Sequence, residues 1–170
     1  FEAMDVSFVA LHGCWPTIPL VISAGMGADL ALALRAYHDR CPSDPPGGYV
    51  PFVLVCTSAY PCPDDAAGLA RLRGDELREY PRIGYSDHTR HPWTGALAVA
   101  AGARIVEFHV RLSDTSPENA DYAVARSPIE AAEYVRNVRT AERMLGSGDQ
   151  RVIMAAEEPM LRYRVNPSLT

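Results

Sequence analysis

The stretch Ile83–Val110, which reads IGYSDHTRHPWTGALAVAAGARIVEFHV, decides the fold of this chain. Two short apolar runs, Arg82–Tyr85 and Arg104–Val110, each end in a polar cluster, and the small-residue segment Trp93–Gly102 lies between them. This order is typical of a strand, a helix and a second strand. If the two strands are parallel neighbours, their carboxyl ends meet at one edge of the sheet, where parallel α/β folds bind ligands.

Two histidines lie at the carboxyl ends of these predicted strands. Because side chains alternate along a strand, His88 shares a face of the first strand with Ser86, and His109 shares a face of the second with Glu107. A lone histidine at a strand end is more often a structural residue than a ligand, so the prediction depends on the pair. Two imidazoles that converge beside a carboxylate predict a site for a divalent metal.

Composition restricts the chemistry that this chain can perform. It has 170 residues, of which 48% are hydrophobic and 22% charged, so one folded domain with a core is expected. The net charge of −5 argues against a nucleic-acid partner. The 16 basic residues are all arginines, which excludes a lysine Schiff base on this chain. Activation of a carbonyl group would therefore need a metal or hydrogen-bond donors.

Cysteine usage and hydropathy indicate the compartment. The four cysteines form no CxxC pair, which argues against a structural zinc site, and we expect free thiols in a reducing environment. No apolar run is long enough to cross a bilayer, and no leader of charged and then apolar residues is found at the start. These features predict a cytoplasmic protein with no membrane partner.

The whole chain reads as four strand–helix units in a row. Its clearest element is the last helix, where Ser127-Pro128-Ile129-Glu130 forms a capping box and Gly146 is a suitable C-cap. Units of this kind make parallel sheets, and four of them are half of an eight-stranded barrel. Beyond Gly146 the pattern is ambiguous, and an arm is one interpretation. The further strands are expected at Leu20–Ser23 and Phe52–Cys56, and further helices at Asp5–His12, Ala28–Asp39 and Asp75–Tyr80.

Five motifs, in order and in register, resemble the sialic acid synthase family, which makes nonulosonic acids from phosphoenolpyruvate. Any one of them is weak, but together they are highly specific, and the resemblance covers about residues 8 to 165. The motifs are Ser23-Ala24-Gly25-Met26, Cys56-Thr57-Ser58-Ala59-Tyr60-Pro61, Gly84-Tyr85-Ser86-Asp87-His88-Thr89, Glu107-Phe108-His109 and Leu145-Gly146-Ser147-Gly148.

The resemblance implies an α/β fold of the TIM-barrel type, with only the C-terminal four βα units on this chain. Residues 1–165 would be the C-terminal half of the synthase barrel and residues 166–170 a tail, without the antifreeze-like domain that usually follows. The implied reaction condenses phosphoenolpyruvate with an N-acetylmannosamine-type sugar aldehyde and releases phosphate. The implied cofactor is Mn²⁺ or Mg²⁺, which holds and polarises the aldehyde.

The resemblance also assigns the site residues. His88 and His109 would bind the metal, and Glu107 beside them is a candidate acid or base. The serines would contact the phosphate or carboxylate of phosphoenolpyruvate, although Ser58 and Ser86 could instead cap helices. Asp87 is expected on the opposite face of the strand from His88, so a structural role fits it better than a role as a metal ligand. The implied substrate-binding residues are Ser23, Ser58, Ser86, Tyr60 and Asp121, of which Tyr60 and Asp121 would face the sugar.

The sequence departs from the family pattern in ways that bear on partners and substrate. The strands of the other half-barrel are missing, so we expect a complementary N-terminal half-barrel chain, a homodimer or a longer protein. The loop Asn119–Ala125 differs from the family's sugar-binding segment, and the family's basic residue before the second histidine is Phe108. A regulatory, non-catalytic half-barrel and a related condensation with a different aldehyde are the alternatives.

Overall fold

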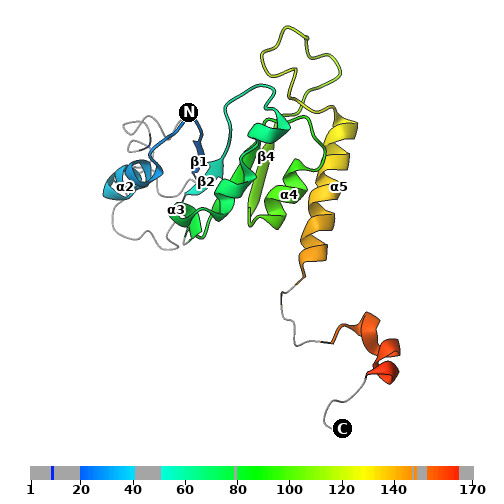
Figure 1. The fold of residues 1–170 in the computed structure, drawn as a ribbon. Coiled ribbons are helices and arrows are strands. Elements are labelled where there is room, and N and C mark those ends of the chain that lie inside the picture. The colour runs from blue at the N-terminus through cyan, green and yellow to red at the C-terminus, as the bar shows by residue number, and fades with distance from the viewer. Residues whose placement is uncertain are drawn as a thin grey trace.

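Four short strands form a single parallel sheet in a computed structural model that describes residues 9, 20–40, 51–78, 80–146, 148 and 153–164. The strands are adjacent in chain order, as is usual for consecutive strand–helix units. The predicted parallel α/β sheet is therefore confirmed, whereas its place in an eight-stranded barrel stays a prediction. The strands are β1 (Val21–Ala24), β2 (Phe52–Val55), β3 (Ile83–Asp87) and β4 (Ile105–Phe108) (Figure 1).

The register of the sheet sorts side chains onto two faces. Ser23 pairs with Leu54 across β1 and β2, and Ser86 pairs with Glu107 across β3 and β4. Because partners in a parallel register point to the same side, these four residues lie on one face, which we call the inner face. The predicted alternation, with Ser86 and Glu107 directed to the same side, is confirmed.

Helices cover the opposite face of the sheet. In Figure 1, α2 lies beside β1, and α4 and α5 lie on the side of β4. Ile22, Val53 and Tyr85 from the strands pack against them in two buried clusters, with Tyr37 of α2 in one and Ala98 of α4 in the other. The helices are α2 (Leu30–Arg40), α3 (Asp75–Arg78), α4 (Thr94–Ala100) and α5 (Pro128–Leu145), with 3₁₀ segments at η2 (Asp64–Ala66), η3 (Leu69–Arg73) and η4 (Ala155–Tyr163).

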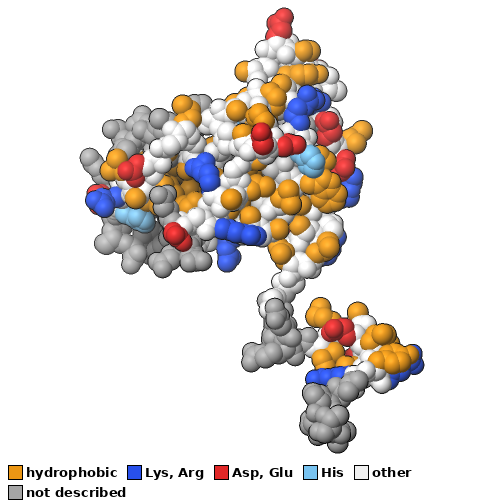
Figure 2. All heavy atoms as spheres, viewed as in Figure 1, with side chains coloured by type: hydrophobic (Ala, Val, Ile, Leu, Met, Phe, Trp, Pro, Cys, Tyr) orange, Lys and Arg blue, Asp and Glu red, His pale blue; other side chains and the backbone are white. Residues whose placement is uncertain are grey.

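The longest helix, α5, begins and ends as its sequence predicts. The Ser127 hydroxyl accepts a hydrogen bond from the Glu130 backbone N–H, and the Glu130 carboxylate accepts one from the Ser127 N–H at 2.7 Å. Pro128 occupies the first turn, and Gly146 has a φ of 60° at the carboxyl end. This helix leaves Ile129, Val135, Met144 and Leu145 exposed, and Figure 2 shows hydrophobic side chains on the surface of this part of the molecule.

Some element boundaries differ from those expected. Strand β3 includes Ser86, as the predicted alternation requires, and ends one residue before His88. Strand β4 ends at Phe108, whereas the expected run continues to Val110. Between β2 and α3 the chain forms the two 3₁₀ segments η2 and η3, which the predicted elements do not include. Val9 is helical, but the rest of the helix expected at Asp5–His12, and the loop expected at Cys41–Pro51 except its last residue, lie outside the described residues.

Cys56 and Cys62 are free, buried thiols, as expected, whereas Cys14 and Cys41 lie outside the described residues. Among the helices that the structure describes, none combines the length and the apolar character needed to cross a membrane.

Candidate functional site

The end of β3 fixes the ring of His88. Its Nδ1 lies 2.8 Å from the backbone carbonyl oxygen of Thr57, and only 4% of the residue is exposed. A carbonyl oxygen can only accept, so Nδ1 carries a proton and donates it. The other ring nitrogen, Nε2, is then available on the side of the ring away from Thr57, where it lies 3.1 Å from the Ser86 hydroxyl oxygen.

The end of β4 holds His109 less tightly. Nδ1 of this ring lies 3.3 Å from a carboxylate oxygen of Asp121, and the two side chains are 24% and 53% exposed. Asp121 belongs to the long loop between β4 and α5, which rises beyond the strand ends in Figure 1. A carboxylate beside Nδ1 of His109 favours the tautomer with the proton on Nδ1, as the Thr57 carbonyl does for His88.

The two imidazoles lie close together, and an aromatic ring covers them. Their ring centroids are 5.4 Å apart, with the planes at 70°. The Tyr60 ring stacks on His88, with the ring centroids 4.2 Å apart, and packs edge-on against His109, with the ring centroids 5.7 Å apart. The structure therefore brings His88, His109, Tyr60 and Asp121 into one cluster, although they come from three separate segments of the chain.

Ser86 and Glu107 extend this cluster across the inner face. The Ser86 hydroxyl donates to the Glu107 carboxylate at 2.9 Å, and the same oxygen lies beside Nε2 of His88. A hydroxyl has one proton, so it serves one of these two acceptors at a time. Ser86 lies inside β3 and caps no helix, so that alternative is wrong for this residue. Glu107 itself is exposed.

The two remaining predicted serines lie on other strands. Ser58 contacts the Cys56 thiol, whose pKa is raised by burial, and a side chain on Gly25 would collide with Ser58. Ser23 is half-buried on the inner face of β1, and its hydroxyl makes no hydrogen bond to another described residue. Neither serine contacts the histidine pair in the described structure, so their contact with an anion stays a prediction.

The donor set suits a divalent metal with open coordination positions. Each histidine has its Nδ1 beside an oxygen acceptor, the arrangement that orients metal-binding imidazoles in proteins. Within residues 20–40, 51–78 and 80–146, no group of three or more His, Cys, Asp or Glu side chains could hold a metal. A cation held by His88 and His109 would thus take its other ligands from water or substrate, as catalytic metals do.

Several neighbours of the histidines have structural roles. Asp87 is fully buried on the helix face, where it accepts hydrogen bonds from Arg126 and Tyr134, which agrees with the expected structural role. Phe108 packs on Tyr134 with ring centroids 4.6 Å apart, away from the inner face as its parity predicts. His91 accepts a hydrogen bond from the Trp93 backbone ahead of α4, also as expected.

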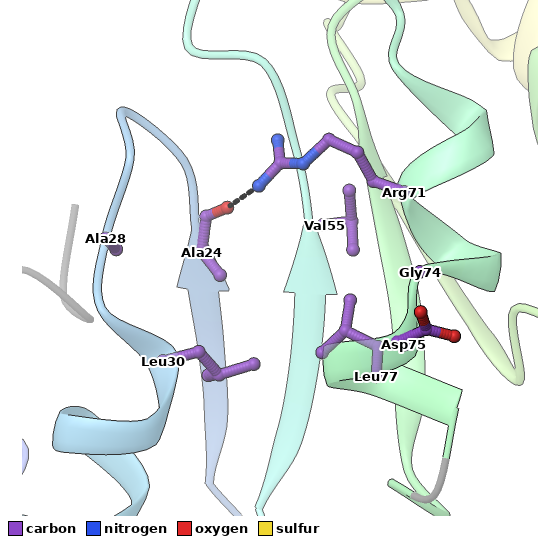
Figure 3. A pocket seen from close by; sticks show the side chains of 8 residues that line it. All are labelled: Ala24, Ala28, Leu30, Val55, Arg71, Gly74, Asp75 and Leu77. Carbon is purple, nitrogen blue, oxygen red and sulfur yellow. Dashed lines mark hydrogen bonds between the residues drawn. The ribbon is translucent and has the colours of Figure 1, made fainter.

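Sequence reasoning missed two anchors. The Thr57 carbonyl that holds His88 is a backbone atom, and no residue type signals it. Arg71, the second anchor, donates to the carbonyl oxygens of Cys56 at 3.1 Å and Ala24 at 3.3 Å, so it ties the ends of β1 and β2 together (Figure 3). The cavity beside Arg71, of about 380 Å³, lies between these strands, α2 and α3, and no predicted site residue lines it.

Comparisons with known proteins show which sequences this chain is similar to. The chain is 35% identical to mouse N-acetylneuraminate-9-phosphate synthase over 84% of its own length and 39% of the relative's. It is 33% identical to N,N'-diacetyllegionaminic acid synthase of Legionella pneumophila over 94% of its length and 44% of the relative's. It therefore spans less than half of these relatives.

The fold also matches a solved structure, that of N-acetylneuraminic acid synthetase from Leptospira borgpetersenii. The TM-score is 0.76 at 24% identity, over 99% of this chain and 55% of the other. A likeness at this identity supports the fold alone. The model of the NeuB family matches residues 16–150, which is most of the chain and includes both histidine motifs. The chain therefore belongs to the NeuB family.

Proposed function

We propose that this chain is the metal-binding half of a nonulosonate synthase. In the proposed reaction a carbon–carbon bond forms between the methylene carbon of phosphoenolpyruvate and the aldehyde carbon of an N-acetylmannosamine-type sugar, one water is consumed, and inorganic phosphate leaves. The observation that supports it most is the pair of imidazoles 5.4 Å apart, each with Nδ1 beside an oxygen acceptor. The names of the relatives, which are synthases of sialic, legionaminic and pseudaminic acids, agree with this class of reaction.

In the proposed site the residues divide the chemistry between them. His88 and His109 would hold Mn²⁺ or Mg²⁺, which supplies a Lewis acid for the sugar carbonyl in a chain that has no lysine. Glu107 is the candidate acid or base, and the hydroxyl of Ser86 orients its carboxylate at 2.9 Å. Tyr60 stacks on the His88 ring, and Asp121, which lies beside Nδ1 of His109, would meet the sugar and orient that ring.

The proposal includes a companion half-barrel, supplied by another chain, by a second copy or by more of the same polypeptide. The chain spans less than half of its curated relatives, and its inner face carries apolar residues near the amino ends of the strands. Of these, Val21 is 40% exposed, and Phe52 and Ile105 are half-buried. Parallel sheets are normally covered on both faces, so we expect this surface to be covered. Size-exclusion chromatography with light scattering tests this, and a well-behaved monomer would count against it.

Titration calorimetry with Mn²⁺ on the full chain tests the site directly. We expect the unaltered chain to bind one Mn²⁺, and His88→Ala and His109→Ala each to abolish binding, because each removes one of only two protein ligands. His91→Ala is the matched control, since His91 is an exposed histidine between the two motifs. Loss of binding in the control, or full binding in both site variants, would refute the metal site.

Turnover is tested by phosphate release from phosphoenolpyruvate and N-acetylmannosamine, with and without a supplied N-terminal half-barrel. We expect release only when both halves are present. Mn²⁺ binding without any turnover in the assembled protein would instead favour the regulatory, non-catalytic subunit.

A different aldehyde is the second candidate substrate, and the loop Asn119–Ala125 is the reason. This loop keeps Asp121 beside His109, but Tyr122 follows it, and its ring lies under the Arg111 guanidinium at 5.0 Å. The tyrosine and arginine alter the surface next to the proposed sugar site. A panel of aldehydes separates the candidates, and a clear preference for N-acetylmannosamine would exclude this second one.

A further inference from the structure

Arg126 joins the two strand ends that carry the histidines. Its backbone N–H donates to the carbonyl oxygen of His109 at 2.8 Å, and its own carbonyl oxygen accepts from the N–H of Arg111 at 2.9 Å. These bonds form a parallel bridge beside Val110 that extends the end of β4. The backbone of Arg126 therefore holds the chain on both sides of Val110, including the carbonyl of His109.

The side chain of the same arginine reaches the other strand end. Its Nη2 lies 2.9 Å from a carboxylate oxygen of Asp87 and 3.2 Å from the backbone carbonyl oxygens of both Thr89 and His91. Asp87 and Thr89 are the residues on either side of His88. One arginine thus contacts the immediate neighbours of the first histidine and the backbone of the second.

This contact is buried and closely packed. The side chains of Arg126 and Asp87 are 6% and 0% exposed. Tyr134 donates to the same Asp87 oxygen at 2.7 Å, and its ring lies 4.1 Å from the Arg126 guanidinium carbon. Nη1 of Arg126 is buried and has no hydrogen-bond partner within the described residues. A buried ion pair with an unpaired donor is weak evidence for stability, because well-packed apolar side chains at the same positions would avoid the cost of removing two charges from water.

We propose that Arg126 is the positioning residue of the two-histidine site. It sets the distance and angle between His88 and His109 by linking the two strand ends from the helix face of the sheet. Asp121 lies shortly before Arg126 in the same loop, and its carbonyl oxygen accepts a hydrogen bond from the N–H of Ala125 at 2.8 Å. The contact between Asp121 and His109 therefore also depends on the position of Arg126. This inference rests on the proposed function, because the spacing of the rings matters only if they share a ligand.

The test compares Arg126→Met with the unaltered full chain. Long-range ¹H–¹⁵N spectra of the metal-free protein report the two imidazoles, and calorimetry reports Mn²⁺ affinity. We expect the resonances of both rings to move and the affinity to fall at least tenfold, as it does when partners of metal ligands are removed. Arg139→Met is the matched control, because Arg139 is an exposed arginine of α5, and it should change neither reading.

A second variant guards against misfolding. Arg126→Met leaves Asp87 buried without its cation, which destabilises the fold. The double variant Asp87→Asn with Arg126→Met removes both charges, and circular dichroism checks that it is folded. We expect both imidazole signals to move in this double variant as well. Unchanged signals in a folded variant, or movement of His88 alone, would overturn the inference. Absence of Mn²⁺ binding in the unaltered chain would overturn the proposed metal site, while the spectra would still decide the role of Arg126.

Discussion

The ends of β3 and β4 differ in how firmly they hold their histidines. At the end of β3, His88 is 4% exposed and donates to a backbone carbonyl, and the adjacent Asp87 is fully buried. At the end of β4, His109 faces a carboxylate that is 53% exposed and belongs to a long loop. Val110, which follows directly, is also exposed.

This difference shows which part of the site is fixed by the fold and which part can vary. A ring held by a backbone carbonyl does not depend on one exposed side chain for its orientation, so the β3 end offers the firmer point of the site. The β4 end depends on Asp121, in a loop where sequence changes cost little stability. We therefore expect chemistry to be fixed at His88, and substrate preference to be adjusted around His109.

The strongest test of the comparison is Gly95→Ala in α4. A side chain on Gly95 would collide with the ring of Tyr134, which holds Asp87 at the β3 end. Overpacking of this kind costs about 2 kcal/mol, so we expect a clear loss in the free energy of unfolding, measured with urea. Leu97→Ala, at an exposed position of the same helix, is the control and should change it by less than about 0.5 kcal/mol. Equal effects of the two variants would mean that the β3 end is not firmly packed.

A smaller effect is expected from Asp121→Ala at the β4 end. Loss of the carboxylate beside Nδ1 of His109 should weaken Mn²⁺ binding about tenfold, because the ring loses its orienting partner. The free energy of unfolding should change by less than about 1 kcal/mol, since the pair is largely exposed. Asp114→Ala, an exposed aspartate of the same loop, is the control for calorimetry and for unfolding. A large loss of stability in Asp121→Ala would show that both strand ends are fixed alike.

Local pattern was enough to predict the sheet and the two histidines at its edge, whereas Tyr60 and Asp121 were predicted only by the family resemblance. The alternation of side chains places Ser86 with Glu107 on one face, and Asp87 and Phe108 on the other, before any contact is known. The capping box at Ser127 marks the start of α5 to the residue. These features depend on neighbours within a few positions of the chain, so a single sequence contains them.

The anchors of the site depend on distant parts of the chain. Thr57 meets His88 across 31 positions through a carbonyl group that every residue possesses, so no pattern distinguishes it. Arg126 meets Asp87 across 39 positions, and an arginine beside Ser127 reads as a surface residue.

The smallest effect is expected at Glu130, near the end of β4. This carboxylate lies 3.3 Å from Arg111, and hydrogen bonds from the side chain and backbone of Ser127 lower its pKa below the ordinary 4.5. A lowered folded pKa adds stability above the unfolded pKa, and that stability is lost as the pH falls through the folded value. Glu130→Gln should therefore cost about 0.5 kcal/mol at pH 7, the range of an exposed helix cap, and less at pH 3 than at pH 7.

Urea unfolding at both pH values measures this, with Glu133→Gln as the control for a charge elsewhere on α5. Since Glu130 is exposed, its loss should remain well below that of Gly95→Ala. If Glu130→Gln costs as much as Gly95→Ala, or if its cost persists at pH 3, then the β4 end is held by more than an exposed cap. In that case the β4 end would hold His109 as firmly as the β3 end holds His88, and the contrast between the two strand ends would be refuted.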